Sequence, residues 1–176
     1  MQLLNGNPWP ELFGQCRRDA FHLEVRDSNA VANESEPFRR FLDGEPDDSE
    51  WFEPWARLVR ETTGRGVKMT RVRVVTVPHA DYQRWLLALS ELNVAAGEDI
   101  RYLPRHSGGA SSIPLDDFWL LDDVRAVFNL VNEEGSAAGA AALTVDPAVV
   151  RLCRGAKERL WQLATPYAEY VSGIGT

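Results

Sequence analysis

Alternating apolar and polar positions, together with short apolar runs, predict six β-strands along the chain. They cover residues 21–26, 67–77, 99–103, 118–121, 125–131 and 138–145. Long segments separate the first three strands, which is the arrangement that gives parallel neighbours through right-handed crossovers. Tight polar turns join the last three, which should therefore form an antiparallel meander.

Apolar residues at steps of three and four predict helices between these strands. The helical segments cover residues 10–20, 37–42 and 47–62, a segment that begins at Pro78, and a long C-terminal segment from Asp146-Pro147 to Pro166. The order of elements predicts a single α/β domain over residues 1–176, with a mixed sheet, strand-helix-strand units, a C-terminal antiparallel meander and a long C-terminal helix.

The strand over residues 67–77 carries two arginines. Because side chains alternate across a strand, Arg71 and Arg73 should share a face. One interpretation is structural: the strand lies near a sheet edge, and its arginines pair with acids on neighbouring strands such as Asp99 or Asp117. The other is functional: two guanidiniums form a pocket for a carboxylate or a phosphate. The sequence leaves both interpretations open.

Further candidate binding residues follow from the position of this strand. Open α/β sheets usually bind ligands beyond the carboxyl ends of their strands, so His79, Asp81 and Tyr82 are the expected rim of a pocket. For His79, helix capping or simple exposure is the alternative interpretation. Two later segments supply further charged and aromatic candidates, namely Glu98, Asp99, Arg101, Asp117 and Trp119.

Charge argues against direct binding of nucleic acid. The chain holds 19 Lys and Arg against 26 Asp and Glu, a net charge of -7, which would repel a phosphate backbone. Only the middle third, residues 67–110, is net positive, and it contains the arginine strand.

Several other classes of protein do not fit the sequence. It has no GxSxG, no Gly-rich phosphate loop with a lysine and no HExxH, and its acids lack the spacing of an EF-hand, so we expect neither a metal nor a cofactor. There is no apolar run of about 20 residues and no secretion signal at the start, which predicts a cytoplasmic protein without a membrane span. Cys16 and Cys153 fit reduced, packed thiols.

Four blocks carry a family resemblance: VRVVTVPHADYQRW, NVAAGEDIRYLPR, DFWLLDD and DPAVVRLCRGAKERLWQLATPYAEY. They resemble short, uncharacterised actinobacterial domain proteins that are commonly encoded near helix-turn-helix regulators of the Xre type. The resemblance runs from about residue 13 to residue 170. It implies a helix-turn-helix regulator as a partner but names no reaction.

The order of elements also resembles one half of the phospholipase D fold. The active half in that superfamily carries a histidine, any residue and a lysine, with an aspartate farther on. The comparable spacing here is His79-Ala80-Asp81, where aspartate replaces lysine. The resemblance therefore implies a fold that binds an anionic ligand without turning it over, and a homodimer would supply the second half.

Two functions remain open at this point. The leading hypothesis is a non-catalytic regulatory or ligand-sensing domain that acts with a helix-turn-helix transcription regulator. The alternative is an enzyme of unassigned chemistry on a phosphate- or carboxylate-bearing small molecule. In that alternative Arg71 and Arg73 hold the substrate, His79 is the acid or base and Asp81 orients it.

Overall fold

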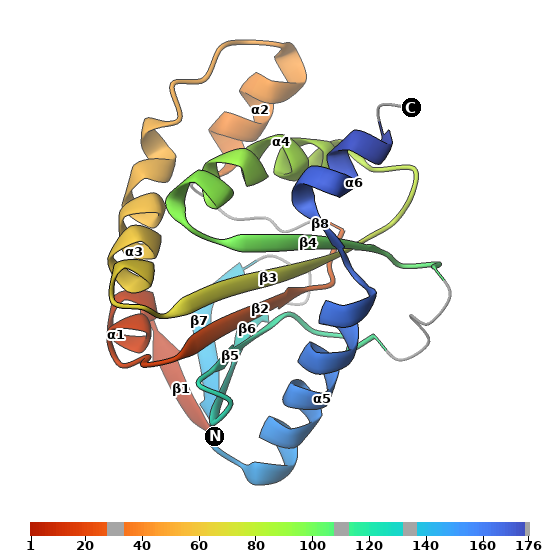
Figure 1. Cartoon of the computed structure of the whole chain (residues 1–176). Helices are drawn as coiled ribbons and strands as arrows, with labels where there is room; N and C mark the ends of the chain where they lie inside the picture. Colours follow the sequence, from red (N-terminus) through yellow and green to blue (C-terminus); the bar gives the residue numbers. More distant parts are fainter. Residues whose placement is uncertain (28–33, 108–112, 132–136, 175–176) are drawn as a thin grey trace.

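An eight-stranded mixed sheet runs through the computed structural model, which describes residues 1–27, 34–107, 113–131 and 137–174 (Figure 1). The strands are β1 Gln2–Asn5, β2 Asp19–Glu24, β3 Lys68–Val75, β4 Asp99–Pro104, β5 Phe118–Leu121, β6 Arg125–Val131, β7 Ala137–Thr144 and β8 Thr165–Pro166. The predicted α/β class, with a mixed sheet and a C-terminal meander, is confirmed.

The strand order is β1-β7-β6-β5-β2-β3-β4-β8. β2, β3 and β4 are parallel neighbours, while β5, β6 and β7 form the predicted antiparallel meander. The arginine strand β3 lies between β2 and β4, so its predicted place near a sheet edge is wrong. A central strand tolerates two arginines here because Glu24 on β2 and Glu98, directly before β4, pair with them.

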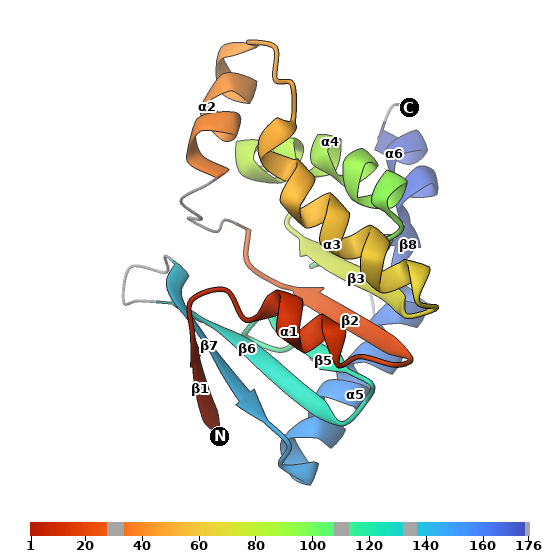
Figure 2. The ribbon, with the colours of Figure 1, turned by 90° about the vertical axis from the view of Figure 1, so that its left-hand side faces the viewer.

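Helices cover both faces of the sheet. They are α1 Trp9–Gly14, α2 Ser35–Asp43, α3 Glu53–Gly64, α4 Asp81–Ala96, α5 Pro147–Leu163 and α6 Tyr167–Ile174, with a 3₁₀ turn η2 at Glu50–Phe52. Figure 2 shows α1 and α3 on the face that is turned to the viewer, with α5 behind the sheet. The chain is thus a three-layer arrangement of helix, sheet and helix.

The alternation predicted for β3 is confirmed. Met69 packs in the cluster that contains residues of α1 and α3, and Arg71 and Arg73 are buried on the same face. Val72 and Val74 pack on the opposite face against α5. A strand buried on both faces is the usual situation in the parallel part of an α/β sheet.

The two ends of the chain contain elements that the pattern did not predict. β1 pairs with β7, and the predicted final helix, which extended to Pro166, ends at Leu163 as α5. The two-residue strand β8 and the helix α6 follow it. β8 pairs with β4, and the ring of Tyr170 on α6 stacks on Tyr102 at 4.8 Å between centroids. The predicted first helix is also shorter, because β2 already begins at Asp19. Strands as short as β1 and β8 are recognised in the structure by their pairing with longer strands.

Both cysteines are buried and free, as the sequence predicted. Burial raises the pKa of each thiol to about 11, so neither is a reactive thiolate near neutral pH. Among the helices of the described part of the chain, none is long and apolar enough to cross a membrane.

The start of α5 provides a first test of the fold. The side chain of Asp146 accepts hydrogen bonds from the backbone N–H groups of Ala148, at 2.7 Å, and of Val149, at 3.4 Å. Asp146→Ala leaves these donors without their cap and should lower the free energy of unfolding by about 1 kcal/mol in urea titrations. Asp116→Ala, which removes an exposed carboxylate paired with Arg26, is the control and should change stability little. An equal loss in the two variants would contradict the assigned cap.

Candidate functional site

A cavity of about 590 Å³ lies between the sheet and the helices α1, α3 and α4. Its aromatic lining includes Trp9, Trp51, Trp55, Tyr82 and Trp119. Much of its polar lining comes from β2, β3 and α4, and includes His22, Glu24, Arg71, Arg73 and Asn93. The volume lies within the usual range for sites that bind small molecules.

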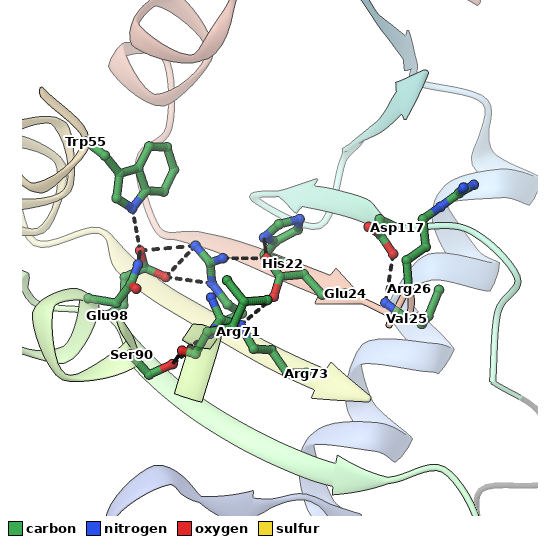
Figure 3. Close-up of polar contacts among 12 residues, drawn as sticks. His22, Glu24, Val25, Arg26, Trp55, Arg71, Arg73, Ser90, Glu98 and Asp117 are labelled. Atoms are coloured by element: carbon green, nitrogen blue, oxygen red, sulfur yellow. Dashed lines mark hydrogen bonds and ion pairs between the residues drawn. The ribbon is translucent and has the colours of Figure 1, made fainter. Parts of the chain in front are cut away.

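Strand alternation places the charged part of this lining. His22 and Glu24 are two residues apart on β2 and therefore share a face, as Arg71 and Arg73 do on β3. The parallel register sets His22 beside Arg71 and Glu24 beside Arg73. Four polar side chains consequently meet on one face of the central sheet (Figure 3).

Arg71 is held by two glutamates. Its Nε donates to Glu98 Oε2 at 2.9 Å, its Nη2 donates to Glu98 Oε1 at 3.1 Å, and its Nη1 donates to Glu24 Oε1 at 2.5 Å. Arg71 is 6% exposed and Glu98 is 4% exposed, so this bidentate pair is almost completely removed from water. Pairs with this geometry are the strong form of the arginine–carboxylate contact.

Arg73 completes the network. Its Nε donates to Glu24 Oε2 at 2.5 Å, so Glu24 bridges both arginines. Its Nη1 donates to the carbonyl of Leu86, to Ser90 Oγ and to Tyr102 Oη at 2.8, 2.7 and 3.2 Å. Burial alone would raise the pKa of Glu24, but Arg71 and Arg73 together hold that pKa well below its usual range. Glu24 is therefore ionised, and its charge is shared between two guanidiniums.

Arg71 and Arg73 pair with carboxylates, but not with the predicted ones, Asp99 and Asp117. Asp99 is exposed, and Asp117 accepts a hydrogen bond from the Val25 backbone N–H at 2.7 Å, apart from the arginines (Figure 3). The prediction for Asp99 is wrong because side chains alternate between the two faces of the sheet along β4 and the residue before it. Glu98 lies on the same side as Ile100 and Tyr102, which face the arginines, whereas Asp99 has the opposite parity.

His22 is the most unusual polar group in the cavity. Its ring stacks on Trp119, with 4.2 Å between centroids and an interplanar angle of 10°. The side chain is buried, and neither ring nitrogen forms a hydrogen bond within the described structure, although Nδ1 lies 3.4 Å from Glu24 Oε1. Burial lowers the pKa of His22 to about 3, so the ring is neutral at physiological pH.

Asn93 on α4 has a similar unpaired atom. Its Nδ2 donates to Glu98 Oε1 at 2.9 Å, and the same carboxylate oxygen accepts from Trp55 Nε1 at 2.9 Å. The Oδ1 atom of Asn93 is buried and has no hydrogen-bond partner among the described residues. Buried polar atoms are rarely left unpaired, so each one requires an explanation.

The predicted rim residues divide between the cavity and other places. Tyr82 lines the cavity, and its hydroxyl donates to Glu34 Oε2 at 2.7 Å; burial raises the pKa of Glu34. His79 does not line it: its Nδ1 lies 3.0 Å from the Thr76 carbonyl oxygen, and its Nε2 lies 2.9 Å from Tyr170 Oη. The geometry therefore gives His79 no place beside Arg71 and Arg73.

The other candidates also lie in different environments. Asp81 is exposed and forms an ion pair with Arg84 on its own helix. Arg101 lies over the ring of Trp161 on α5, 4.0 Å from the ring centroid, on the opposite face of the sheet. Trp119 and Asp117 both line the cavity. The ten predicted residues therefore do not form one site.

The sequence interpretation missed His22, Glu24, Glu34 and Asn93. For His22 and Glu24 a signal was present, because alternation over residues 21–26 places both on one face, as it does for the two arginines. Glu34 and Asn93 had no such signal, since their positions depend on how α2 and α4 pack. No group of three or more His, Cys, Asp or Glu that could hold a metal ion occurs in the described ranges.

Comparisons with known proteins agree with this fold. A family model for a domain of unknown function, DUF6879, matches residues 7–172. The phospholipase D family member Nuc from Salmonella typhimurium is similar in structure, with a TM-score of 0.55 and 9% identity over 94% of this chain and 96% of that one. NucT from Helicobacter pylori has a TM-score of 0.53 and 10% identity over 91% of this chain and 89% of that one. No curated protein matches in sequence.

These likenesses concern the fold alone, since the identities are low. The chain has the phospholipase D-like half-domain that its topology predicted. Its three histidines are followed two positions later by Glu24, Asp81 and Gly108, so no His-x-Lys triplet occurs in the sequence.

Proposed function

The chain belongs to the DUF6879 family of domains of unknown function, and we propose that it is a non-catalytic, ligand-sensing domain that acts with a helix-turn-helix transcription regulator. The observation that carries this proposal is the cavity of about 590 Å³, which brings together aromatic walls and unpaired, buried polar atoms.

The polar groups of the cavity support binding rather than catalysis. Glu24 and Glu98 are both engaged by arginines, which leaves neither of them free as a general base. His22 stays neutral far below physiological pH, so it is a poor proton acceptor for acid-base catalysis. The chain also lacks the His-x-Lys triplet that contains the histidine nucleophile of the phospholipase D reaction.

The regulatory partner follows from the sequence resemblance and the charge. The resemblance is to actinobacterial domains encoded near Xre-type regulators, and a chain of net charge -7 depends on a partner for contact with DNA. A homodimer is the assembly that the phospholipase D-like half-domain suggests. In this arrangement the domain senses the ligand and the helix-turn-helix protein reads the DNA.

Co-purification with an Xre-type helix-turn-helix regulator tests this proposal. We expect a complex on size-exclusion chromatography with light scattering, which also reports whether the domain alone is a homodimer. We further expect at least one compound of a metabolite library to raise the melting temperature of the domain without being consumed. Absence of both the complex and any stabilising compound would refute the proposal, and turnover of a stabilising compound would favour an enzyme.

A further inference from the structure

We propose that the cavity binds an uncharged, flat heteroaromatic ring that carries both hydrogen-bond donors and acceptors, the class to which nucleobases and nucleosides belong. This inference rests on the proposed function, because it names the ligand that such a sensor would bind. It also changes the ligand class that the sequence alone predicts, which is anionic.

The charges around the cavity disfavour an anion. Two guanidiniums, those of Arg71 and Arg73, face two carboxylates, those of Glu24 and Glu98, so the network has no net positive charge. The other acidic side chains that line the cavity are Glu34 and Asp117, and among the described residues the lining contains no lysine and no arginine besides Arg71 and Arg73. An anionic ligand would have to displace a buried carboxylate from its arginine, which is costly.

The aromatic walls disfavour a cation. Trp55 and Trp119 could attract a cation over their faces. The guanidinium carbon of Arg71 already lies 5.9 Å from the ring centroid of Trp55 and 5.8 Å from that of Trp119. A second cation beside these rings would be repelled by Arg71. The cavity thus suits a neutral ligand.

The unpaired polar atoms define the hydrogen bonds such a ligand would make. The Oδ1 atom of Asn93, a residue 2% exposed, can only accept a hydrogen bond. The neutral ring of His22, a residue 7% exposed, offers one donor and one acceptor. A ligand that carries both donors and acceptors could pair with Asn93 Oδ1 and with the His22 ring, and nucleobase edges carry both.

The tryptophans explain why the ligand should be flat. Trp9, Trp51 and Trp55 line the cavity and are only partly buried, so part of each ring can contact a ligand. Base–aromatic stacking depends on the π-face that every nucleobase has. A cavity of about 590 Å³ is also large enough for a ring with an attached sugar.

Titration calorimetry on the full chain, with tryptophan fluorescence as a second readout, tests this inference. The probes are adenosine, guanosine, cytidine and uridine, the corresponding 5′-monophosphates, choline as a cation, and benzyl alcohol as a ring with little hydrogen-bonding capacity. We expect at least one nucleoside to bind and its monophosphate to bind no more tightly. Choline and benzyl alcohol should bind at least about tenfold more weakly, because they leave the buried polar atoms unpaired.

Variants locate the binding in the cavity. His22→Phe keeps an aromatic ring against Trp119 but removes both ring nitrogens, and should weaken nucleoside binding by roughly tenfold or more. His79→Phe, outside the cavity, is the matched control and should leave the affinity unchanged. If His22→Phe does not fold, Asn7→Trp provides the test: Asn7 is an exposed lining residue, and a larger side chain there should narrow the entrance and weaken binding.

The outcomes separate this inference from the proposed function. Binding of a monophosphate or of choline without the nucleosides would overturn the ligand class and leave a sensor intact. Binding of a nucleoside followed by its conversion would support the ligand class and overturn the non-catalytic function. Nucleoside affinity that neither His22→Phe nor Asn7→Trp changes would place binding elsewhere and overturn the inference.

Discussion

Replacing Arg71 with methionine is expected to lower the free energy of unfolding by about 3–5 kcal/mol. The substitution removes the cation that joins Glu24 to Glu98. It leaves Glu98, which is 4% exposed, as a buried carboxylate whose remaining side-chain donors in the described structure, Trp55 and Asn93, are neutral. Methionine preserves most of the volume of the side chain, so the loss reports the charge rather than a cavity. Urea titrations followed by circular dichroism at pH 7 measure it.

Two further variants test whether this loss of stability comes from the buried charge. Arg84→Met breaks an ion pair with Asp81 whose side chains are about 60% exposed, and should change stability little because solvent screens such pairs. Arg71→Met combined with Glu98→Leu should regain part of the lost stability, since it no longer buries a lone carboxylate. A loss below about 1 kcal/mol in Arg71→Met would contradict the buried network.

Acidification is expected to destabilise the protein well before its exposed carboxylates are protonated. The pKa of His22 is about 3 in the fold, against an ordinary value of 6.5, so the unfolded chain binds this proton first. The stability that depends on a neutral His22 is complete above pH 6.5 and falls as pH decreases toward 3. At pH 5 the expected loss is about 2 kcal/mol relative to neutral pH.

Glu24 adds a second loss at lower pH. Because Arg71 and Arg73 hold its pKa below the ordinary value of 4.5, its contribution is present above pH 4.5 and is lost as the pH falls below that value. Urea midpoints measured from pH 7.5 down to about pH 3 should therefore fall in two overlapping stages.

Substitution of single histidines shows which residue causes the first stage, the loss of stability between pH 6.5 and pH 5. His22→Phe should make stability nearly independent of pH between 6.5 and 5, while leaving the second stage in place. His106→Phe, at an exposed position, is the control and should keep both stages. If His22→Phe retains the full slope between pH 6.5 and pH 5, then burial of His22 is not its source.

Much of the fold could be predicted from the periodicity of the chain. The order of strands and helices, the shared face of Arg71 and Arg73, and the meander after Phe118 all follow from local alternation and from the length of the connections. The positions of β1 and β8 could not be predicted, because each is set by its pairing with a strand distant in sequence, β7 or β4, and not by a periodic pattern of its own. Such a strand forms only where a neighbouring strand edge is available to it.

The candidate site was less predictable than the fold, for a related reason. Alternation indicates which side chains share a face within one strand, and it suffices to place His22 with Glu24. It does not indicate which strands are neighbours, or which of Glu98 and Asp99 faces the arginines. The sequence interpretation therefore identified the arginines correctly and assigned them the wrong carboxylates.

By itself the sequence determined the class of fold, the face that carries Arg71 and Arg73, and the absence of a His-x-Lys triplet, since these depend only on residue identity and local geometry. Only the tertiary structure decided that Glu24 and Glu98 neutralise those arginines and that His22 and Asn93 keep unpaired atoms in the cavity. Such pairings join residues up to 49 positions apart, as between Glu24 and Arg73, and they follow from strand register and helix packing rather than from spacing along the chain.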